Sequence, residues 1–178
     1  MSCQKMKPLR NSKKPFRIVA LGGTFDCFHK GHEALILKAL NIGEKVIIGL
    51  TSDDFAKRLG KSHPIQDYGE RKGVLEEFLK NLGANHRVEI VSLNDPYGIA
   101  AESPEIEALI VSEETEPRGH ELNKLREERG LKPLSIIVVS MVLGVDGKPI
   151  SSTAIRLGRI RRNGSLPEIP DKSFSQAS

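Results

Sequence analysis

The sequence predicts a single α/β domain built on a five-stranded, mostly parallel sheet with helices on both faces. The length of 178 residues is enough for one domain with a sizeable core. Short apolar segments alternate along the chain with amphipathic segments of helical spacing. The apolar segments are continuous, which is typical of strands that are buried on both faces of a parallel sheet. Ligands of such sheets bind beyond the carboxyl ends of the strands, so function is expected in the residues that follow each strand.

Five apolar segments are the expected strands. Their β-branched and aliphatic content favours extended structure, and turn residues bound them. The first ends in a Gly-Gly pair, and the fourth is apolar throughout. In chain order they are Phe16–Leu21, Lys45–Leu50, Arg87–Leu93, Ala108–Val111 and Ser135–Val142.

Four longer helices are expected, and the first two have apolar residues at helical spacing. Gly43, Gly83 and Gly130 stand where three of these helices are expected to stop. After the second strand, Thr51–Asp54 also resembles a helix cap. The four longer helices are expected over Gly31–Asn41, Asp67–Leu82, Glu116–Arg129 and Ser151–Arg162.

The two ends of the chain are expected to be flexible tails. Residues 1–14 form a basic tail and residues 164–178 a polar one, which leaves residues 15–163 as the domain. The net charge is +4, but residues 1–15 contain five basic and no acidic side chains, so the remainder carries −1. The folded part is therefore not expected to bind nucleic acid.

Composition also limits the class of protein. No apolar run approaches the roughly 20 residues that span a bilayer, and the N-terminus lacks a signal-peptide pattern, so no membrane partner is expected. Cys3 and Cys27 form neither a disulfide framework nor a metal-binding pair. These features indicate a cytoplasmic protein and leave its oligomeric state open between a monomer and a small homo-oligomer.

A glycine-rich segment with two histidines joins the first strand to the first helix. Gly22–Thr24 follow the strand, and His29-Lys30-Gly31-His32 opens the helix. A helix N-terminus offers N–H groups and a positive dipole end to a phosphate. His29 and His32 are three residues apart, so both lie on one side of the first turn. Two imidazoles there can donate hydrogen bonds to phosphate oxygens as charge builds in a transition state.

Two other interpretations of this histidine pair exist. The histidines could be incidental at a polar helix start, or they could ligate a metal. The spacing is shorter than in the HExxH zinc helix, and no cysteine pair or third histidine lies nearby, so no metal ligand is assigned. Cys27, inside the same segment, is expected to be an apolar filler and not a nucleophile.

A second polar motif follows the fifth strand. Ser151, Ser152 and Thr153 can cap a helix and offer hydroxyl and N–H groups, and Arg156 lies one turn further on. A guanidinium in this place can make a charge-assisted contact with phosphate. The alternative is an ordinary serine-capped helix with a surface arginine.

The two motifs together resemble the HxGH and ISSTxxR signatures of the nucleotidylyltransferase superfamily. That resemblance implies a Rossmann-like domain that attacks the α-phosphate of a nucleoside triphosphate and releases pyrophosphate. It also implies that the ISSTxxR-like segment holds the β- and γ-phosphates.

Four further segments resemble the archaeal and eukaryotic-type phosphopantetheine adenylyltransferases. They are Asp67–Lys72, Val111–Thr115, Arg118–Asn123 and Arg126–Leu134. The resemblance covers residues 16–162 and implies transfer of the adenylyl group of ATP to 4′-phosphopantetheine, giving dephospho-coenzyme A, with Mg²⁺ accompanying ATP.

Site residues follow from the motifs and the resemblance. An acceptor phosphate is already an oxyanion, so positioning and electrostatic stabilisation are expected to dominate catalysis. The expected catalytic residues are His29, His32 and Lys57. The expected ATP-binding residues are Gly22, Gly23, Thr24, Phe25, His32, Ser112, Thr115, Ser151, Ser152, Thr153 and Arg156. The expected acceptor-binding residues are Thr24, Lys57 and Arg71.

Some of these assignments have alternatives. Lys57, Arg58 and Lys61 all follow the second strand, and the choice of Lys57 among them is open, as is a solvated helix face for all three. Arg71 could instead form a surface ion pair. Ser112 and Thr115 could simply cap the helix that follows them.

Other functions are also compatible with the first motif. Nicotinamide mononucleotide adenylyltransferase, archaeal FAD synthetase and glycerol-phosphate cytidylyltransferase share the first motif. Class I aminoacyl-tRNA synthetases have a similar element, but this chain is too short for tRNA-binding domains. A nucleotide-binding sensor would bind ATP without releasing pyrophosphate with any acceptor.

Overall fold

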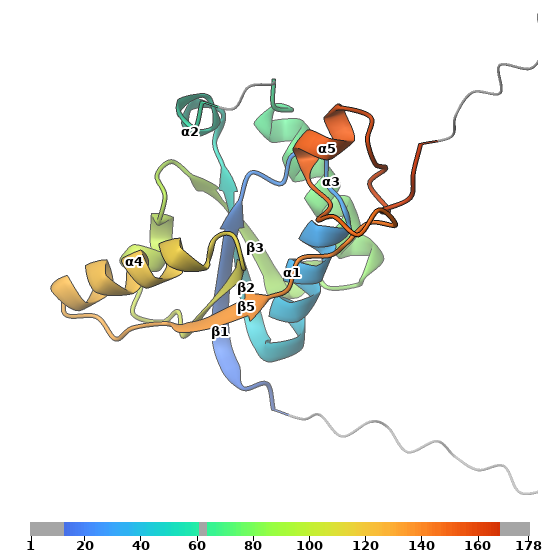
Figure 1. Cartoon of the computed structure of the whole chain (residues 1–178). Coiled ribbons are helices and arrows are strands. Elements are labelled where there is room, and N and C mark those ends of the chain that lie inside the picture. The colour runs from blue at the N-terminus through green and yellow to red at the C-terminus, as the bar shows by residue number, and fades with distance from the viewer. Residues whose placement is uncertain (1–12, 61–63, 168–178) are drawn as a thin grey trace, which may run out of the picture.

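The computed structural model describes residues 13–60 and 64–167. In that part of the chain five strands form one sheet in the order β3-β2-β1-β4-β5, and every neighbouring pair is parallel (Figure 1). This order places β1 at the centre of the sheet, so the loop that follows β1 lies in the middle of the edge formed by the carboxyl ends of the strands. The strands are β1 (Phe16–Gly23), β2 (Gly43–Thr51), β3 (Val88–Leu93), β4 (Ala108–Ser112) and β5 (Ser135–Val139).

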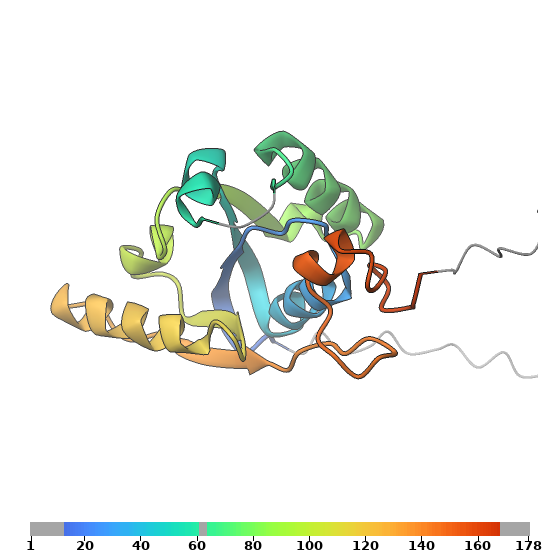
Figure 2. The same ribbon diagram turned by 45° about the horizontal axis from the view of Figure 1, so that its top comes forward.

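Helices cover both faces of the sheet. One face carries α1 (Lys30–Ile42) and α3 (Tyr68–Asn81), and the other carries α4 (Glu116–Glu128) and the 3₁₀ turn η2 (Gly98–Ala101) (Figures 1 and 2). The remaining elements are short: α2 (Asp53–Arg58), η1 (Asn85–Arg87) and α5 (Ser152–Arg156). The predicted α/β class with a parallel sheet and two helical layers is confirmed.

Successive side chains of β1 belong to two different hydrophobic cores, one on each face of the sheet. Val19 and Leu21 belong to the larger core, with Ile36 of α1 and Leu75 of α3. Ala20 belongs to the smaller core under α4. Successive strand side chains point to opposite faces, so one buried strand supports both layers.

Most predicted boundaries lie within two residues of the observed ones, but two ends are wrong. The last helix stops at Arg156 instead of Arg162, because Gly158 adopts a left-handed conformation (φ 66°) that ends a helix. The fifth strand stops at Val139 instead of Val142, because its neighbour β4 ends at Ser112, the partner of Val139.

The predicted tails fall mostly on residues outside the described ranges. Ordered structure extends beyond the expected domain end at 163, because Gly164 is buried and its carbonyl accepts a hydrogen bond from the Val145 N–H. Among the described residues, no helix is both long and apolar enough to cross a bilayer.

Candidate active site

A cavity of about 820 Å³ lies at the carboxyl ends of the central strands. Its walls come from β1, β2 and β4, from the start of α1, and from the start of α5. This is the position that a parallel sheet predicts for a ligand site. The predicted site residues that line it are Gly22, Gly23, Thr24, Phe25, His29, His32, Ser112, Thr115, Ser151, Ser152 and Thr153.

The two histidines are fixed by hydrogen bonds at the N-terminus of α1. The His29 Nδ1 accepts from the Gly31 N–H at 3.1 Å, and the His32 Nδ1 accepts from the His29 N–H at 3.4 Å. This reciprocal pair is a capping box built from two imidazoles. Because both Nδ1 atoms accept, each ring in its neutral form carries its proton on Nε2 and can donate from that side. The rings stack with their centroids 3.8 Å apart.

His29 is neutral at physiological pH. Burial lowers its pKa to about 4, and the positive charge of Arg162 acts in the same direction. A neutral imidazole still donates one hydrogen bond from Nε2. The site therefore offers a hydrogen-bond donor without requiring a buried positive charge.

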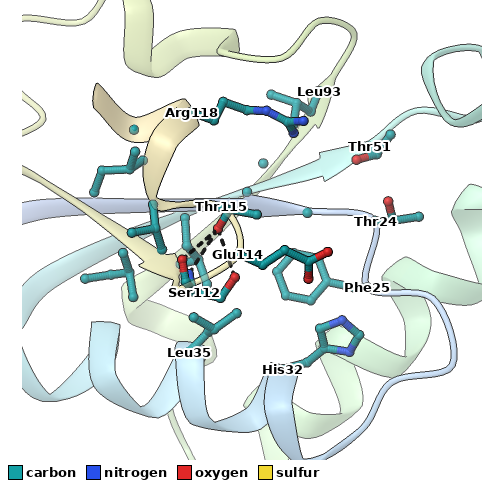
Figure 3. Close-up of a pocket in the computed structure, with 18 of the residues that line it drawn as sticks. Thr24, Phe25, His32, Leu35, Thr51, Leu93, Ser112, Glu114, Thr115 and Arg118 are labelled. Atoms are coloured by element: carbon teal, nitrogen blue, oxygen red, sulfur yellow. Dashed lines mark hydrogen bonds between the residues drawn. The ribbon is translucent and has the colours of Figure 1, made fainter. Parts of the chain in front are cut away.

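Two phenylalanines hold the ring of His32. Phe25 lies 5.1 Å and Phe28 5.7 Å from it between ring centroids, and Phe28 stacks on it. Phe25 is buried and lines the cavity. The aromatic contacts restrict the orientation of His32 beside the cavity (Figure 3).

Asp26 joins the two polar motifs. Its carboxylate is buried and accepts from the Arg156 Nε at 3.0 Å, the Arg156 Nη2 at 2.8 Å and the Gln66 N–H at 3.0 Å. Its carbonyl accepts from the Ser152 hydroxyl at 2.6 Å. The start of α5 is thereby held against the loop between β1 and α1. Sequence reasoning gave Asp26 no role, and the only available signal was a carboxylate inside the first motif.

Cys27 follows Asp26 in the same loop. Its N–H donates to the Gln66 side-chain carbonyl at 2.9 Å. Burial and the neighbouring Asp26 carboxylate raise the pKa of the Cys27 thiol. The group is a protonated thiol at neutral pH, which agrees with its expected role as a filler and not a nucleophile.

Ser112 and Thr115 form a polar turn between β4 and α4. Their hydroxyl oxygens lie 3.0 Å apart, and the Thr115 hydroxyl also accepts from the Ser112 N–H at 3.0 Å (Figure 3). Thr115 is the N-cap residue of α4, but its side chain makes no capping hydrogen bond. The cap alternative is therefore wrong for Thr115, whose hydroxyl serves the turn that borders the cavity.

Several lining residues were not predicted. Thr51 lies beside Thr24, Glu114 reaches toward Phe25, and Arg118 extends from the first turn of α4 toward Leu93 (Figure 3). The Tyr97 hydroxyl, at the start of η2, donates to the Glu121 carboxylate at 3.3 Å. Of these residues, Thr51, Tyr97, Glu114 and Arg118 lie at or shortly after the carboxyl end of a strand. That common position was the signal that could have found them.

Three predicted site residues do not line the cavity: Lys57, Arg71 and Arg156. Lys57 lies exposed in the last turn of α2, and its role stays a prediction. Of its two alternatives, Arg58 donates to the Asn94 carbonyl, and Lys61 lies outside the described residues. Arg156 is bound to Asp26, so its phosphate contact also stays a prediction.

Arg71 lies in the interior, where acceptors of the protein itself bind its guanidinium. Its side chain is 1 % exposed. Its guanidinium donates to the carbonyls of Gln66, Thr24 and Thr51 and to the Asp53 carboxylate. The surface ion-pair alternative is wrong, because the pair with Asp53 is buried on the arginine side, and the contact with an acceptor phosphate stays a prediction. Helical spacing alone did not show that this face of α3 meets the strand ends.

Comparison of the sequence with known proteins shows the family to which the chain belongs. A family model described as cytidylyltransferase-like matches residues 20–158. The phosphopantetheine adenylyltransferase of Methanopyrus kandleri is 46 % identical over 141 residues, covering 79 % of this chain and 89 % of that protein. The protein of the same name from Methanosarcina barkeri is 48 % identical over 151 residues, covering 83 % and 91 %.

A solved structure has the same fold. The crystal structure of a protein of unknown function from Archaeoglobus fulgidus superimposes with a TM-score of 0.62 at 27 % identity, covering 84 % of this chain and 98 % of that one. The matched family model spans both polar motifs, the second half of β1 and the other four strands. The chain therefore belongs to the cytidylyltransferase-like family and, within it, groups with proteins named phosphopantetheine adenylyltransferase.

Proposed function

We propose that this protein transfers the adenylyl group of ATP to 4′-phosphopantetheine, giving dephospho-coenzyme A and pyrophosphate. The observation that carries the proposal is that His29 and His32 border the same cavity as Ser151–Thr153, although these segments lie at opposite ends of the chain. The names of the relatives support this choice of acceptor.

The proposed reaction is an in-line displacement at phosphorus. A phosphate oxygen of the acceptor forms a bond to the α-phosphorus of ATP. The bond from the α-phosphorus to the oxygen that bridges to the β-phosphate breaks, and that oxygen leaves with pyrophosphate. The nucleophile is already ionised, so no side chain has to remove a proton.

The two histidines would act on the phosphoryl group that is transferred. Their Nε2–H groups can donate to its non-bridging oxygens, whose charge is redistributed in the transition state. Thr24 lies in the cavity on the loop that leads to them and would contact both the triphosphate and the acceptor phosphate. The capping box and the aromatic contacts fix the rings before substrate binds, so little reorganisation is needed during the reaction.

The start of α5 would hold the leaving group. Ser151, Ser152 and Thr153 line the cavity, and we assign them to the β- and γ-phosphates. Arg156 would add positive charge there while it remains paired with Asp26. Lys57, on the exposed end of α2, is the candidate for a basic residue near the acceptor phosphate and the α-phosphate.

The donor set fits Mg²⁺ that arrives with ATP. No group of three histidine, cysteine or acidic side chains among residues 13–60 and 64–167 is arranged to hold a metal ion. The cavity instead offers hydroxyl groups, and Mg²⁺ commonly binds through substrate phosphates and water. Bound in this way, the ion would neutralise phosphate charge. An ATP-dependent step in coenzyme A synthesis also leads us to place the protein in the cytoplasm.

Pyrophosphate release tests the proposed function. We expect release with ATP and 4′-phosphopantetheine, and much less with CTP or with nicotinamide mononucleotide or glycerol phosphate as the acceptor. ATP binding without pyrophosphate release in the presence of any of these acceptors would refute the proposal and favour a sensor.

The role of His32 has its own test. His32→Ala should lower kcat at saturating ATP by more than about tenfold, which corresponds to roughly 1.4 kcal/mol of transition-state stabilisation. His86→Ala changes an exposed histidine in η1, away from the cavity, and should leave kcat unchanged. A smaller loss for His32→Ala would exclude the transition-state role.

A further inference from the structure

We propose that Arg71 is a positioning residue that holds Thr24 and Thr51 at the phosphate end of the cavity. Arg71 itself lies outside the cavity wall, whereas both threonines line it. The inference rests on the proposed function only for the choice of activity assay, because the contacts that define it are independent of the substrate.

The Arg71 guanidinium bridges the ends of two neighbouring strands. Its Nη1 donates to the Thr24 carbonyl at 2.9 Å and to the Thr51 carbonyl at 2.7 Å. Gly23 of β1 pairs with Leu50 of β2, so the two threonines are the next residues along each strand. At this point the ladder between β1 and β2 ends, and Arg71 supplies the donors that a continued sheet would otherwise provide.

The remaining donors of Arg71 fix the arginine and a third segment. Its Nε donates to the Gln66 carbonyl at 2.8 Å, and its Nη2 donates to the Asp53 carboxylate at 2.7 Å. Burial opposes ionisation of Asp53, but the Tyr68 N–H and the Arg71 guanidinium outweigh it and lower the Asp53 pKa. Asp53 therefore stays charged and provides the counter-ion for a buried cation.

The restrained loop contains backbone strain. Phe25 and Cys27 have φ values of 51° and 47°, in the left-handed region that non-glycine residues rarely adopt. Such conformations persist where surrounding contacts over-determine them. Arg71 binds the carbonyl just before Phe25, and Gln66, which Arg71 also binds, accepts from the Cys27 N–H. Without these contacts the loop is free to relax, which would move Thr24 and the approach to His29.

Only a guanidinium satisfies this arrangement. Three acceptors are carbonyls and one is a carboxylate, and they surround a planar group whose N–H bonds point in fixed directions. A lysine ammonium keeps the charge but has three donors on one atom. Arg71→Lys therefore separates the bridging geometry from the charge.

The test compares Arg71→Lys with Arg87→Lys. Arg87 donates to the carbonyls of Leu40, Gly43 and Glu44 where α1 ends and β2 begins, at the opposite end of that strand. We expect Arg71→Lys to lower kcat by about tenfold or more and to change the KM for ATP less than threefold. Arg87→Lys should leave kcat unchanged. An Arg71→Lys enzyme with wild-type kcat per folded molecule would overturn the proposal.

Amide hydrogen exchange gives a readout that does not depend on activity. Arg71→Lys should increase exchange in residues 24–28 by more than about tenfold, while residues in the middle of α1 keep their protection. Equal protection of residues 24–28 in the variant and the wild type would overturn the proposal. Absence of pyrophosphate release by the wild-type protein would refute the proposed function and leave this exchange measurement valid.

A second variant covers the case in which Arg71→Lys does not fold. Asp53→Asn changes a partner whose side chain is 46 % exposed and weakens one of the four contacts at Arg71, because the amide oxygen accepts the hydrogen bond without the charge of the carboxylate. We expect it to fold, to lower kcat by a few-fold, and to increase exchange in residues 24–28. A folded Asp53→Asn protein without either change would contradict the proposal.

Discussion

Gly31 determines how close the chain of α1 approaches the ring of His29. A Cβ atom at this position would lie 2.9 Å from the His29 Cε1 and 3.0 Å from its Nδ1. Contacts this short cannot form, so any side chain here would displace the ring. Gly31 therefore makes room for the ring of His29, a proposed catalytic side chain.

Gly31→Ala should therefore reduce turnover through His29. We expect kcat to fall by about tenfold to a hundredfold, since small displacements of positioned groups have effects of this size. Gly73→Ala on α3 is the matched control, because nothing lies within 4 Å of a Cβ there. That control should raise the free energy of unfolding by about 0.5–1 kcal/mol and leave kcat unchanged. Equal kcat values for both variants would contradict the proposed ring displacement.

The buried position of His29 also predicts a pH dependence of stability. Its pKa is lowered from 6.5 to about 4 in the folded state. Above pH 6.5 the ring is neutral in both the folded and the unfolded state, so its titration does not change the free energy of unfolding. As the pH falls from 6.5 toward 4, the unfolded chain binds a proton that the folded protein does not, so the free energy of unfolding decreases, by about 2 kcal/mol at pH 5.

Urea unfolding of the wild type and of His29→Asn at pH 7 and pH 5 measures this contribution. The asparagine does not titrate, so the variant should lose about 2 kcal/mol less than the wild type between the two pH values. The comparison between variants removes the contribution of carboxylates that titrate in the same range. Identical pH dependence in the two proteins would show that His29 titrates normally.

Among the secondary structure elements, α1 and α5 are joined through one buried carboxylate. The α5 helix has five residues and no buried residue of its own, so its position depends on polar contacts of its first and last residues. Asp26 provides these contacts by binding Arg156 twice and Ser152 once. The end of α5 that is proposed to bind phosphate is therefore positioned by the loop that precedes α1.

Asp26→Asn should weaken this connection. Removing one charge leaves Arg156 without its bidentate partner, and we expect the free energy of unfolding to fall by about 2–4 kcal/mol. Glu33→Gln removes the surface pair with Lys30 and should cost less than about 1 kcal/mol. Denaturant unfolding of both variants checks the difference. Similar losses would show that the buried pair contributes no more than the exposed one.

Across the whole molecule, the cavity is enclosed by segments far apart in the sequence. The β1–α1 loop, the turn before α4 and the start of α5 each form part of its wall. A ligand that contacts all three is bound by the folded protein and not by the unfolded chain. ATP is therefore expected to stabilise the fold as a unit.

A non-hydrolysable ATP analogue at 100 times its Kd should raise the free energy of unfolding by about 2.7 kcal/mol. Adenosine at the same concentration lacks the phosphates that the two motifs are proposed to hold, and should stabilise the protein much less. Chemical denaturation in the presence of each ligand measures both values. Equal stabilisation by adenosine would place the binding energy in the base and not in the phosphate motifs.

Periodicity and capping signals predicted most of the fold because they report local structure. The helix expected over Asp67–Leu82 spans Tyr68–Asn81, with Asp67 as its N-cap and Leu82 as its C-cap. The end of the last helix was missed although Gly158 supplied the stop signal. The end of the fifth strand depends on the length of β4, which is a neighbour in space and not in the sequence.

The sequence by itself determined the parallel sheet, the two polar motifs and the location of both at strand or helix ends. Residue type and spacing contain this information, because hydrophobic alternation and helix capping act over a few residues. Only the tertiary structure decided the partners of the charged groups: Arg71 turned inward to the strand ends, and Arg156 paired with Asp26. Whether a charge meets phosphate, a carboxylate or a carbonyl depends on burial and on chain segments far away in the sequence, and no local pattern specifies these.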